Sequence, residues 1–303
     1  MFKEICTVFS PSGAEDKMRS ILTERLSLLF DEVYTDTFGN LIAHKSGSGK
    51  KICVECGIDT PGIMVVSVSD KKTFFTVFGG LTAAALIGKK IRFANGCFGF
   101  VRSDSKTSED TKVSDLYIEV CGGSVSVSDI GAVDSEHCET DEKIYSHGLA
   151  PRAALLAALT AACDLPKSDN DIYFVFTAQK LLGGRGIRAF FAVNDFDEII
   201  SVSACGAAGS FKPGCGCGIA VRDKGNVSSP ELRRGISDVA GRFAVKHELF
   251  AAEDNLYLES FCLAGNSAAL CGLCVPIEYK DSAFEGAYKS DIKDTARLIC
   301  AVL

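Results

Sequence analysis

Apolar residues in the first 64 positions follow two different periods. Between Glu15 and Leu29, directly after Ser12-Gly13, they recur at spacings of three and four, which predicts an amphipathic helix. These positions are Met18, Ile21, Leu22, Leu26 and Leu29. The β-rich runs EVYTDTFGNLIAHK and KKICVECGID follow, and we expect a hairpin-like pair with its turn at Phe38-Gly39-Asn40.

The stretch 65–146 has almost no helical period. Short alternating runs rich in Val, Ser, Thr, Phe and Gly, such as MVVSVSD and TFFTVFGG, succeed one another along it. This pattern is typical of a small barrel or sandwich, so we predict an all-β insertion here.

From residue 147 onward, helical and strand patterns alternate. Apolar runs predict helices over 152–162, 186–193 and 291–302, and the segments IYFVFTAQ and EIISVSA predict buried strands. Strands that are apolar on both faces imply a sheet covered by helices. We therefore predict an α/β fold with a central mixed sheet, formed by residues 1–64 and 147–303 and interrupted by a β domain at 65–146.

Composition narrows the class of protein further. The chain has 303 residues, is 47% hydrophobic and carries a net charge of −7, with 32 Lys and Arg against 39 Asp and Glu. A large core is therefore available, and the acidic balance argues against a nucleic-acid binder. No apolar window reaches the roughly 18 residues of a membrane span, and the N-terminus has no apolar signal region. We expect no membrane association and a cytoplasmic location.

Fourteen cysteines spread over this length favour a reducing compartment. The CxxC pairs Cys53/Cys56 and Cys271/Cys274 stand in apolar runs more than 200 residues apart. This placement favours small buried side chains on strands, with zinc binding or redox chemistry as the alternative.

Five motifs, in order, resemble one family. The chain is similar to the glutamyl or deblocking aminopeptidases, dinuclear-metal peptidases that assemble as tetrahedral particles and are also labelled endoglucanase-like. The first four matching segments are Ser10–Asp16 (PSGxE), Asp36 with Gly39–Ala43 (DxxGNLIA), Gly79-Gly80 with Leu86–Ile91, and Phe174–Gly186 (FVFTAQKLLGGRG). The fifth is Pro276–Ser282 with Glu285 (PxRYxHSxxE).

The resemblance implies two zinc or cobalt ions, five ligand side chains and a glutamate as general base. In this sequence the ligand positions fall on Gly57, Ala150, Leu181, Ser203 and Asp281, and the base position falls on Lys180. Two neighbours of the family site, Asp59 and Arg152, are retained. Four of the five ligand positions thus hold no metal-binding carboxylate, thiolate or imidazole, and only Asp281 could still bind a metal. The ammonium at the base position would repel a dication.

These residues predict a vestigial site: no metal cofactor, no catalytic residue, and a peptidase homologue that acts as a binding or assembly protein. We expect Lys180 to replace the metal charge by pairing with Asp59 or Asp281, with Arg152 nearby. The alternative is an active, metal-dependent aminopeptidase that releases N-terminal residues from peptides through unusual ligands. The candidate ligands would be Asp59, Asp254, Asp281, Cys56 and Cys205.

The expected partners follow from the same resemblance and from the composition of the insertion. A β domain of about 80 residues rich in Phe and Val is expected to bury surface against a second copy. We therefore expect at least a homodimer through the β insertion, with peptides as candidate ligands.

Overall fold

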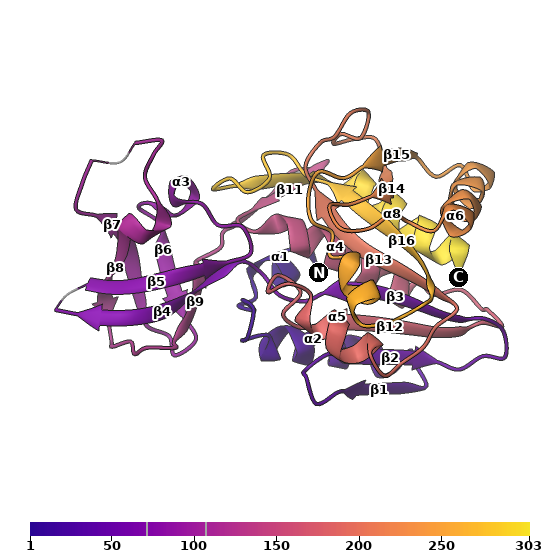
Figure 1. Cartoon of the computed structure of the whole chain (residues 1–303). Coiled ribbons are helices and arrows are strands. Elements are labelled where there is room, and N and C mark those ends of the chain that lie inside the picture. The colour runs from indigo at the N-terminus through magenta and orange to yellow at the C-terminus, as the bar shows by residue number, and fades with distance from the viewer. Residues whose placement is uncertain (71, 107) are drawn as a thin grey trace.

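The computed structural model describes residues 1–70, 72–106 and 108–303, and it consists of an α/β body from which a β-barrel projects to one side (Figure 1). The body contains an eight-stranded mixed sheet. Its strands, in spatial order, are β1 (Glu32–Thr35), β2 (Leu41–Lys45), β12 (Asp171–Thr177), β3 (Lys51–Gly57), β13 (Glu198–Cys205), β16 (Ala269–Pro276), β14 (Cys217–Arg222) and β15 (His247–Ala251). This agrees with the predicted α/β class.

Helices cover both faces of this sheet, which explains why its central strands are apolar on both sides. Along β12, Phe174 and Phe176 belong to one hydrophobic core while Val175 belongs to the other, because successive side chains of a strand point to opposite faces. The helices of the body are α1 (Phe2–Thr7), α2 (Asp16–Leu26), α4 (Leu149–Cys163), α5 (Arg185–Phe191), α6 (Pro230–Arg242), α7 (Glu259–Leu263) and α8 (Lys289–Val302). The short helix α3 (Ala83–Leu86) belongs to the barrel instead, where Ala83 and Leu86 are part of its core. The apolar α4 is buried along most of its length and packs against β3, β13 and α8.

The barrel is closed and has its own core. Its strands are β4 (Gly62–Ser69), β5 (Lys72–Phe78), β6 (Lys90–Phe93), β7 (Phe98–Ser103), β8 (Leu116–Gly122) and β9 (Ile130–Val133), with the short helix η1 (Val113–Asp115) between β7 and β8. Where the sequence suggested an insertion over 65–146, the barrel strands extend from Gly62 to Val133. The next strands, β10 (His137–Glu139) and β11 (Lys143–Ser146), form a three-stranded sheet with β17 (Glu285–Tyr288) of the body.

The predicted hairpin is only partly present. Residues 32–45 fold into the antiparallel pair β1–β2 with its turn at 36–40, but KKICVEC is not its partner. Strand β12 lies between β2 and β3, antiparallel to the first and parallel to the second. A strand from more than 120 residues further along the chain therefore displaces the local pairing that the sequence favoured.

The structure also shows where the paired cysteines lie and whether any helix could span a membrane. Cys53 and Cys56 lie buried on β3, Cys271 and Cys274 lie buried on β16, and all 14 cysteines are free. Within residues 1–70, 72–106 and 108–303, no helix combines the length and apolar character that crossing a bilayer requires.

Candidate functional site

A cleft of about 190 Å³ opens at the carboxyl ends of the central strands. Gly57 ends β3, Lys180 follows β12, and Ser203 lies two residues before the end of β13, so parallel strands bring these distant residues together. Seven of the eight residues predicted for the vestigial site line the cleft: Gly57, Asp59, Ala150, Lys180, Leu181, Ser203 and Asp281. Arg152 lies behind this wall and lines a smaller, adjacent cavity.

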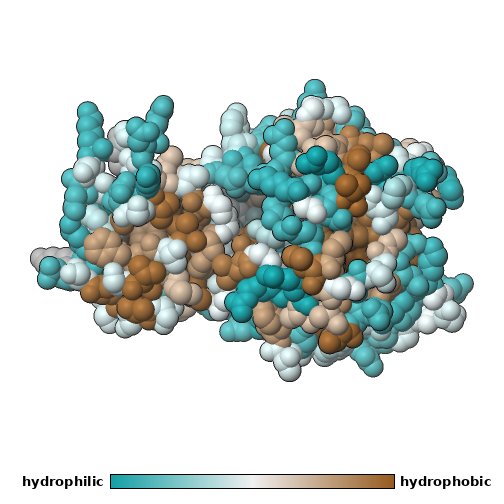
Figure 2. All heavy atoms as spheres, viewed as in Figure 1, coloured by the Kyte–Doolittle hydropathy of each residue, from teal (hydrophilic) through white to brown (hydrophobic). Residues whose placement is uncertain are grey.

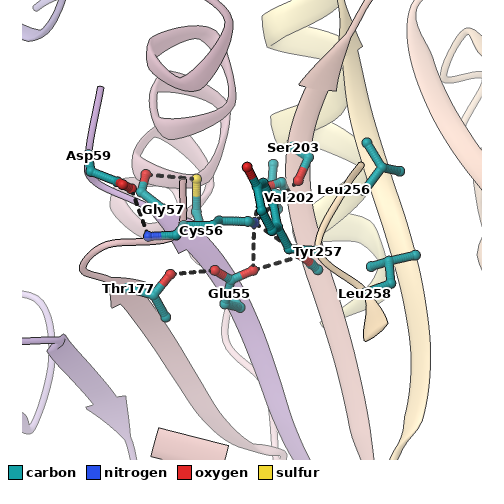
Figure 3. Close-up of polar contacts among 12 residues, drawn as sticks. Glu55, Cys56, Gly57, Asp59, Thr177, Val202, Ser203, Leu256, Tyr257 and Leu258 are labelled. Carbon is teal, nitrogen blue, oxygen red and sulfur yellow. Dashed lines mark hydrogen bonds and ion pairs between the residues drawn. The ribbon is translucent and has the colours of Figure 1, made fainter. Parts of the chain in front are cut away.

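The floor of the cleft is a buried ion pair. The Lys180 ammonium lies 2.9 Å from Glu55 Oε2, and the Glu55 side chain has no exposed surface (Figure 3). Glu55 also accepts hydrogen bonds from the hydroxyls of Thr177, at 2.5 Å, and Ser201, at 2.7 Å. The carboxylate is thus paired and hydrogen-bonded, as a buried charge must be.

The Lys180 ammonium has no donor left for a ligand. Besides Glu55, the oxygen atoms of Ser201 Oγ, Val202 O and Ser203 Oγ lie within 3.3 Å of Nζ, so three N–H groups face four acceptors. Burial alone would lower the pKa of Lys180, but the Glu55 carboxylate raises it above its ordinary value. Lys180 is therefore a fixed positive charge rather than a general base at neutral pH.

The predicted ion pair of Lys180 with Asp59 or Asp281 is wrong. Asp59 does bind Lys180, but through its backbone, because Oδ1 accepts the Lys180 N–H at 3.1 Å while Oδ2 accepts the Leu181 N–H at 2.9 Å. The Ser12 hydroxyl donates to the same carboxylate at 2.6 Å. The Asp281 carboxylate instead pairs with Lys280, at 2.8 Å.

The loop that carries Lys180 is held by side chains from the N-terminal motifs. Four successive backbone N–H groups, from residues 178 to 181, each donate to a side-chain oxygen. The acceptors are Asn40 for the first, Glu15 for the second and Asp59 for the last two. The motif residues Glu15 and Asn40 therefore fix the position of the loop without touching the centre of the cleft.

Asp59 is electrostatically unusual. Burial raises its pKa from 3.8 to about 6, although the hydrogen bonds from Ser12 and from the Leu181 amide act in the opposite direction. A carboxyl group with such a pKa titrates close to the physiological range, which is common at functional sites.

The rim of the cleft is polar. Lys280 bridges the carboxylates of Asp281 and Asp254, and the buried Glu285 accepts the backbone N–H groups of Ala150 and Asp281. Tyr257 covers the side near Ser203 (Figure 3). Several rim and loop residues have positive φ angles that side chains other than glycine seldom adopt: Gln179, Tyr257, Tyr279 and Asp281. Such backbone strain concentrates at functional sites.

Glu55 and Ser201 are the site residues that the sequence analysis missed. Glu55 stands inside the apolar run KICVECG, and Ser201 stands inside EIISVSA. A charged residue in an otherwise apolar central strand is a signal of a buried ion pair, because an unpaired charge there would be very costly.

The donors at the cleft do not fit a dinuclear metal centre. Gly57, Ala150 and Leu181 offer no side-chain ligand, and the Ser203 hydroxyl is already bonded to an ammonium. In the part of the chain that the structure describes, no three His, Cys, Asp or Glu side chains are grouped so that they could hold a metal ion. The thiol of Cys56 is not a ready ligand either, because burial raises its pKa far above the ordinary value.

Two comparisons of the sequence with known proteins agree on the class of protein that this chain is similar to. The family model for M42 glutamyl aminopeptidases matches residues 39–298. A protein of Acetivibrio thermocellus that bears the name of an aminopeptidase is 29% identical, over 99% of this chain and 96% of its own length.

Solved structures share the fold over the whole chain. An aminopeptidase from the archaeon Desulfurococcus kamchatkensis superposes with a TM-score of 0.92 at 20% identity, covering 99% of this chain and 92% of that one. A TET peptidase of Pyrococcus horikoshii, described as able to assemble into a tetrahedron or a large octahedral shell, gives a TM-score of 0.89 at 20% identity, covering 99% and 97%. At this identity the likeness establishes the fold alone.

Proposed function

The chain belongs to the M42 glutamyl aminopeptidase family, and from this premise we propose that it is a metal-independent, non-hydrolytic member whose cleft binds a ligand instead of cleaving it. The observation that carries the proposal is the buried Lys180–Glu55 ion pair on the cleft floor. An ammonium at this point supplies fixed positive charge where the family resemblance calls for metal ions.

The packing around Gly57 supports the same proposal. A Cβ atom added at Gly57 would lie 2.8 Å from Lys180 Cδ and 3.0 Å from Lys180 Cβ. The Lys180 stem therefore fills the volume that a histidine ligand at position 57 would need. The two positions are coupled, and a metal-ligating side chain at 57 is incompatible with the observed lysine conformation.

The cleft retains what a binding site needs. It is concave, it combines small apolar residues with a polar rim, and its walls are fixed by buried hydrogen bonds. Peptides are the candidate ligands because the chain keeps the cleft of a peptidase family. They would be bound and not cleaved, because the floor of the cleft offers neither a free general base nor a metal-ligand set.

Metal content and hydrolysis test this proposal together. Purified protein incubated with Zn²⁺ or Co²⁺ and then desalted is expected to retain less than about 0.1 metal ion per chain, since one or two carboxylates hold a dication weakly against water. Aminoacyl-anilide hydrolysis with either metal present is expected to stay at the rate of the metal-only blank. Two tightly bound ions per chain together with metal-dependent turnover would instead establish the alternative, an active aminopeptidase with unusual ligands.

We also propose that the chain forms at least a homodimer through the barrel. Apolar residues gather on the barrel surface in Figure 2, and Val66, Val68 and Val127 are each about half exposed. Exposed apolar side chains of this kind mark interaction surfaces. Light scattering at tens of micromolar protein is expected to give a mass of at least two chains. The double variant Val66→Asp with Val68→Asp should lower this mass to that of one chain. A monomeric mass for the unmodified chain would contradict the proposal.

A further inference from the structure

Tyr257 enters the cleft from an unusual backbone conformation. Its φ angle is 64°, and such strain persists only where neighbouring contacts enforce it. Here Oδ2 of the buried Asp223 accepts the N–H groups of Leu256, at 3.2 Å, and of Leu258, at 3.1 Å. The Asn255 side chain accepts the N–H of Tyr257 itself, at 2.7 Å. Leu256 and Leu258 are buried in the core, whereas the tyrosine between them lines the cleft.

The hydroxyl of Tyr257 is free to bind a ligand. The ring packs against the core that contains Val175, but within the described residues the hydroxyl has no hydrogen-bond partner. Burial raises the pKa of this phenol above its ordinary value, so the group keeps its proton and can donate at neutral pH. The other influences on it are the charges of the cleft: Asp59, Lys180, Lys280 and Asp281. The hydroxyl therefore lies where a polar atom of a bound ligand would meet it.

The volume of the cleft limits the size of that ligand. At about 190 Å³ the cleft is smaller than the roughly 300–1,000 Å³ of sites that take drug-sized molecules. Its boundaries are fixed, because Lys180 is held on the floor by four polar contacts and the Tyr257 ring covers the side near Ser203 (Figure 3). The space that is left suits one or two amino-acid residues with small side chains.

We propose that Tyr257 determines which ligands the cleft accepts: its ring restricts the site to short peptides with small side chains, and its hydroxyl donates a hydrogen bond to a backbone carbonyl of the peptide. This inference rests on the proposed binding function, to which it adds a size limit and a contact residue. A backbone carbonyl is the acceptor that every peptide offers, whatever its side chains.

The dipeptides Ala-Ala and Leu-Leu are suitable probes, because they share their charges and backbone and differ in side-chain volume. Isothermal titration calorimetry with the full chain is expected to give a Kd for Ala-Ala at least about tenfold below that for Leu-Leu. Tyr257→Ala should enlarge the cleft, so that Leu-Leu binds at least as tightly as Ala-Ala. Tyr257→Phe keeps the ring and its packing, so it should preserve the preference but weaken Ala-Ala binding about fivefold to tenfold.

Tyr34→Ala is the matched control, because it removes a half-exposed tyrosine from the edge strand β1 and should leave both affinities unchanged. If the unmodified chain binds a dipeptide and both Tyr257 variants bind it equally well, the role of Tyr257 is wrong while the binding function stands. A preference of the unmodified chain for Leu-Leu would overturn the size limit, and an unchanged Ala-Ala affinity in Tyr257→Phe would overturn the hydroxyl contact. Binding of neither dipeptide by any of these proteins would contradict peptide binding itself, and this inference with it.

Discussion

Replacing Lys180 by methionine is expected to lower the free energy of unfolding by roughly 3–5 kcal/mol, because the variant leaves the Glu55 carboxylate buried without its counter-charge. The double variant Lys180→Met with Glu55→Gln should recover most of this loss, since the neutral amide can still accept from Thr177. Urea unfolding followed by far-UV circular dichroism is the suitable measurement, because the chain has no tryptophan.

The matched control is Lys50→Met, which breaks an exposed ion pair with Glu198. Exposed pairs contribute about 1 kcal/mol or less, so this variant should unfold almost like the unmodified chain. If Lys180→Met were no more destabilising than Lys50→Met, or if adding Glu55→Gln made the loss larger, Lys180 would not be the partner that makes the buried carboxylate tolerable.

Asp59→Asn is expected to remove a pH dependence of stability between about pH 4 and pH 6. The pKa of Asp59 is raised to about 6 in the folded chain by burial, against 3.8 as its ordinary value. In this interval the folded state keeps a proton that the unfolded state releases, so the free energy of unfolding falls as pH rises. Relative to Asp59→Asn, the unmodified chain should lose on the order of 3 kcal/mol across the interval.

The comparison is made between variants because other carboxyl groups, such as Glu285, titrate in both proteins and cancel in the difference. Ser12→Ala provides a second check, because it removes a hydroxyl whose hydrogen bond lowers the pKa of Asp59. In that variant the loss of stability should continue to a higher pH. Parallel pH profiles for the unmodified chain and Asp59→Asn would show that Asp59 does not carry the effect.

The local periodicities predicted the α/β class and the main helices well. The helix expected over 152–162 extends over Leu149–Cys163, and the helix expected over 291–302 begins two residues earlier, at Lys289. Both succeed because a helix that buries an apolar face shows its period within its own sequence. The hairpin failed because strand order depends on pairing with distant segments, and no local pattern shows that Ile42 pairs with Val175.

The candidate site was likewise predicted in part: the sequence indicated which residues lie there but not how their side chains pair. The resemblance predicted seven residues that line one cleft, and three of them, Gly57, Lys180 and Ser203, lie at or just beyond the carboxyl ends of neighbouring strands of one sheet. It could not show which atoms of Lys180 face which carboxylate. The Lys180 amide faces Asp59, whereas the ammonium extends past Gly57 to Glu55, two residues before it on the same strand. Only the path of the side chain through the packed floor separates these two arrangements.

The three-stranded sheet of β10, β11 and β17 gives the barrel a mechanical connection to the cleft. Ser146 on β11 lies opposite Glu285 on β17, and the Glu285 carboxylate holds the amides of Ala150 and Asp281 in the cleft wall. The segment that leads from the barrel back to the body is thus paired, through β11, with β17, and is not a free linker. The barrel's return segment and the cleft wall therefore share one hydrogen-bonded sheet, in which Glu285 belongs to both.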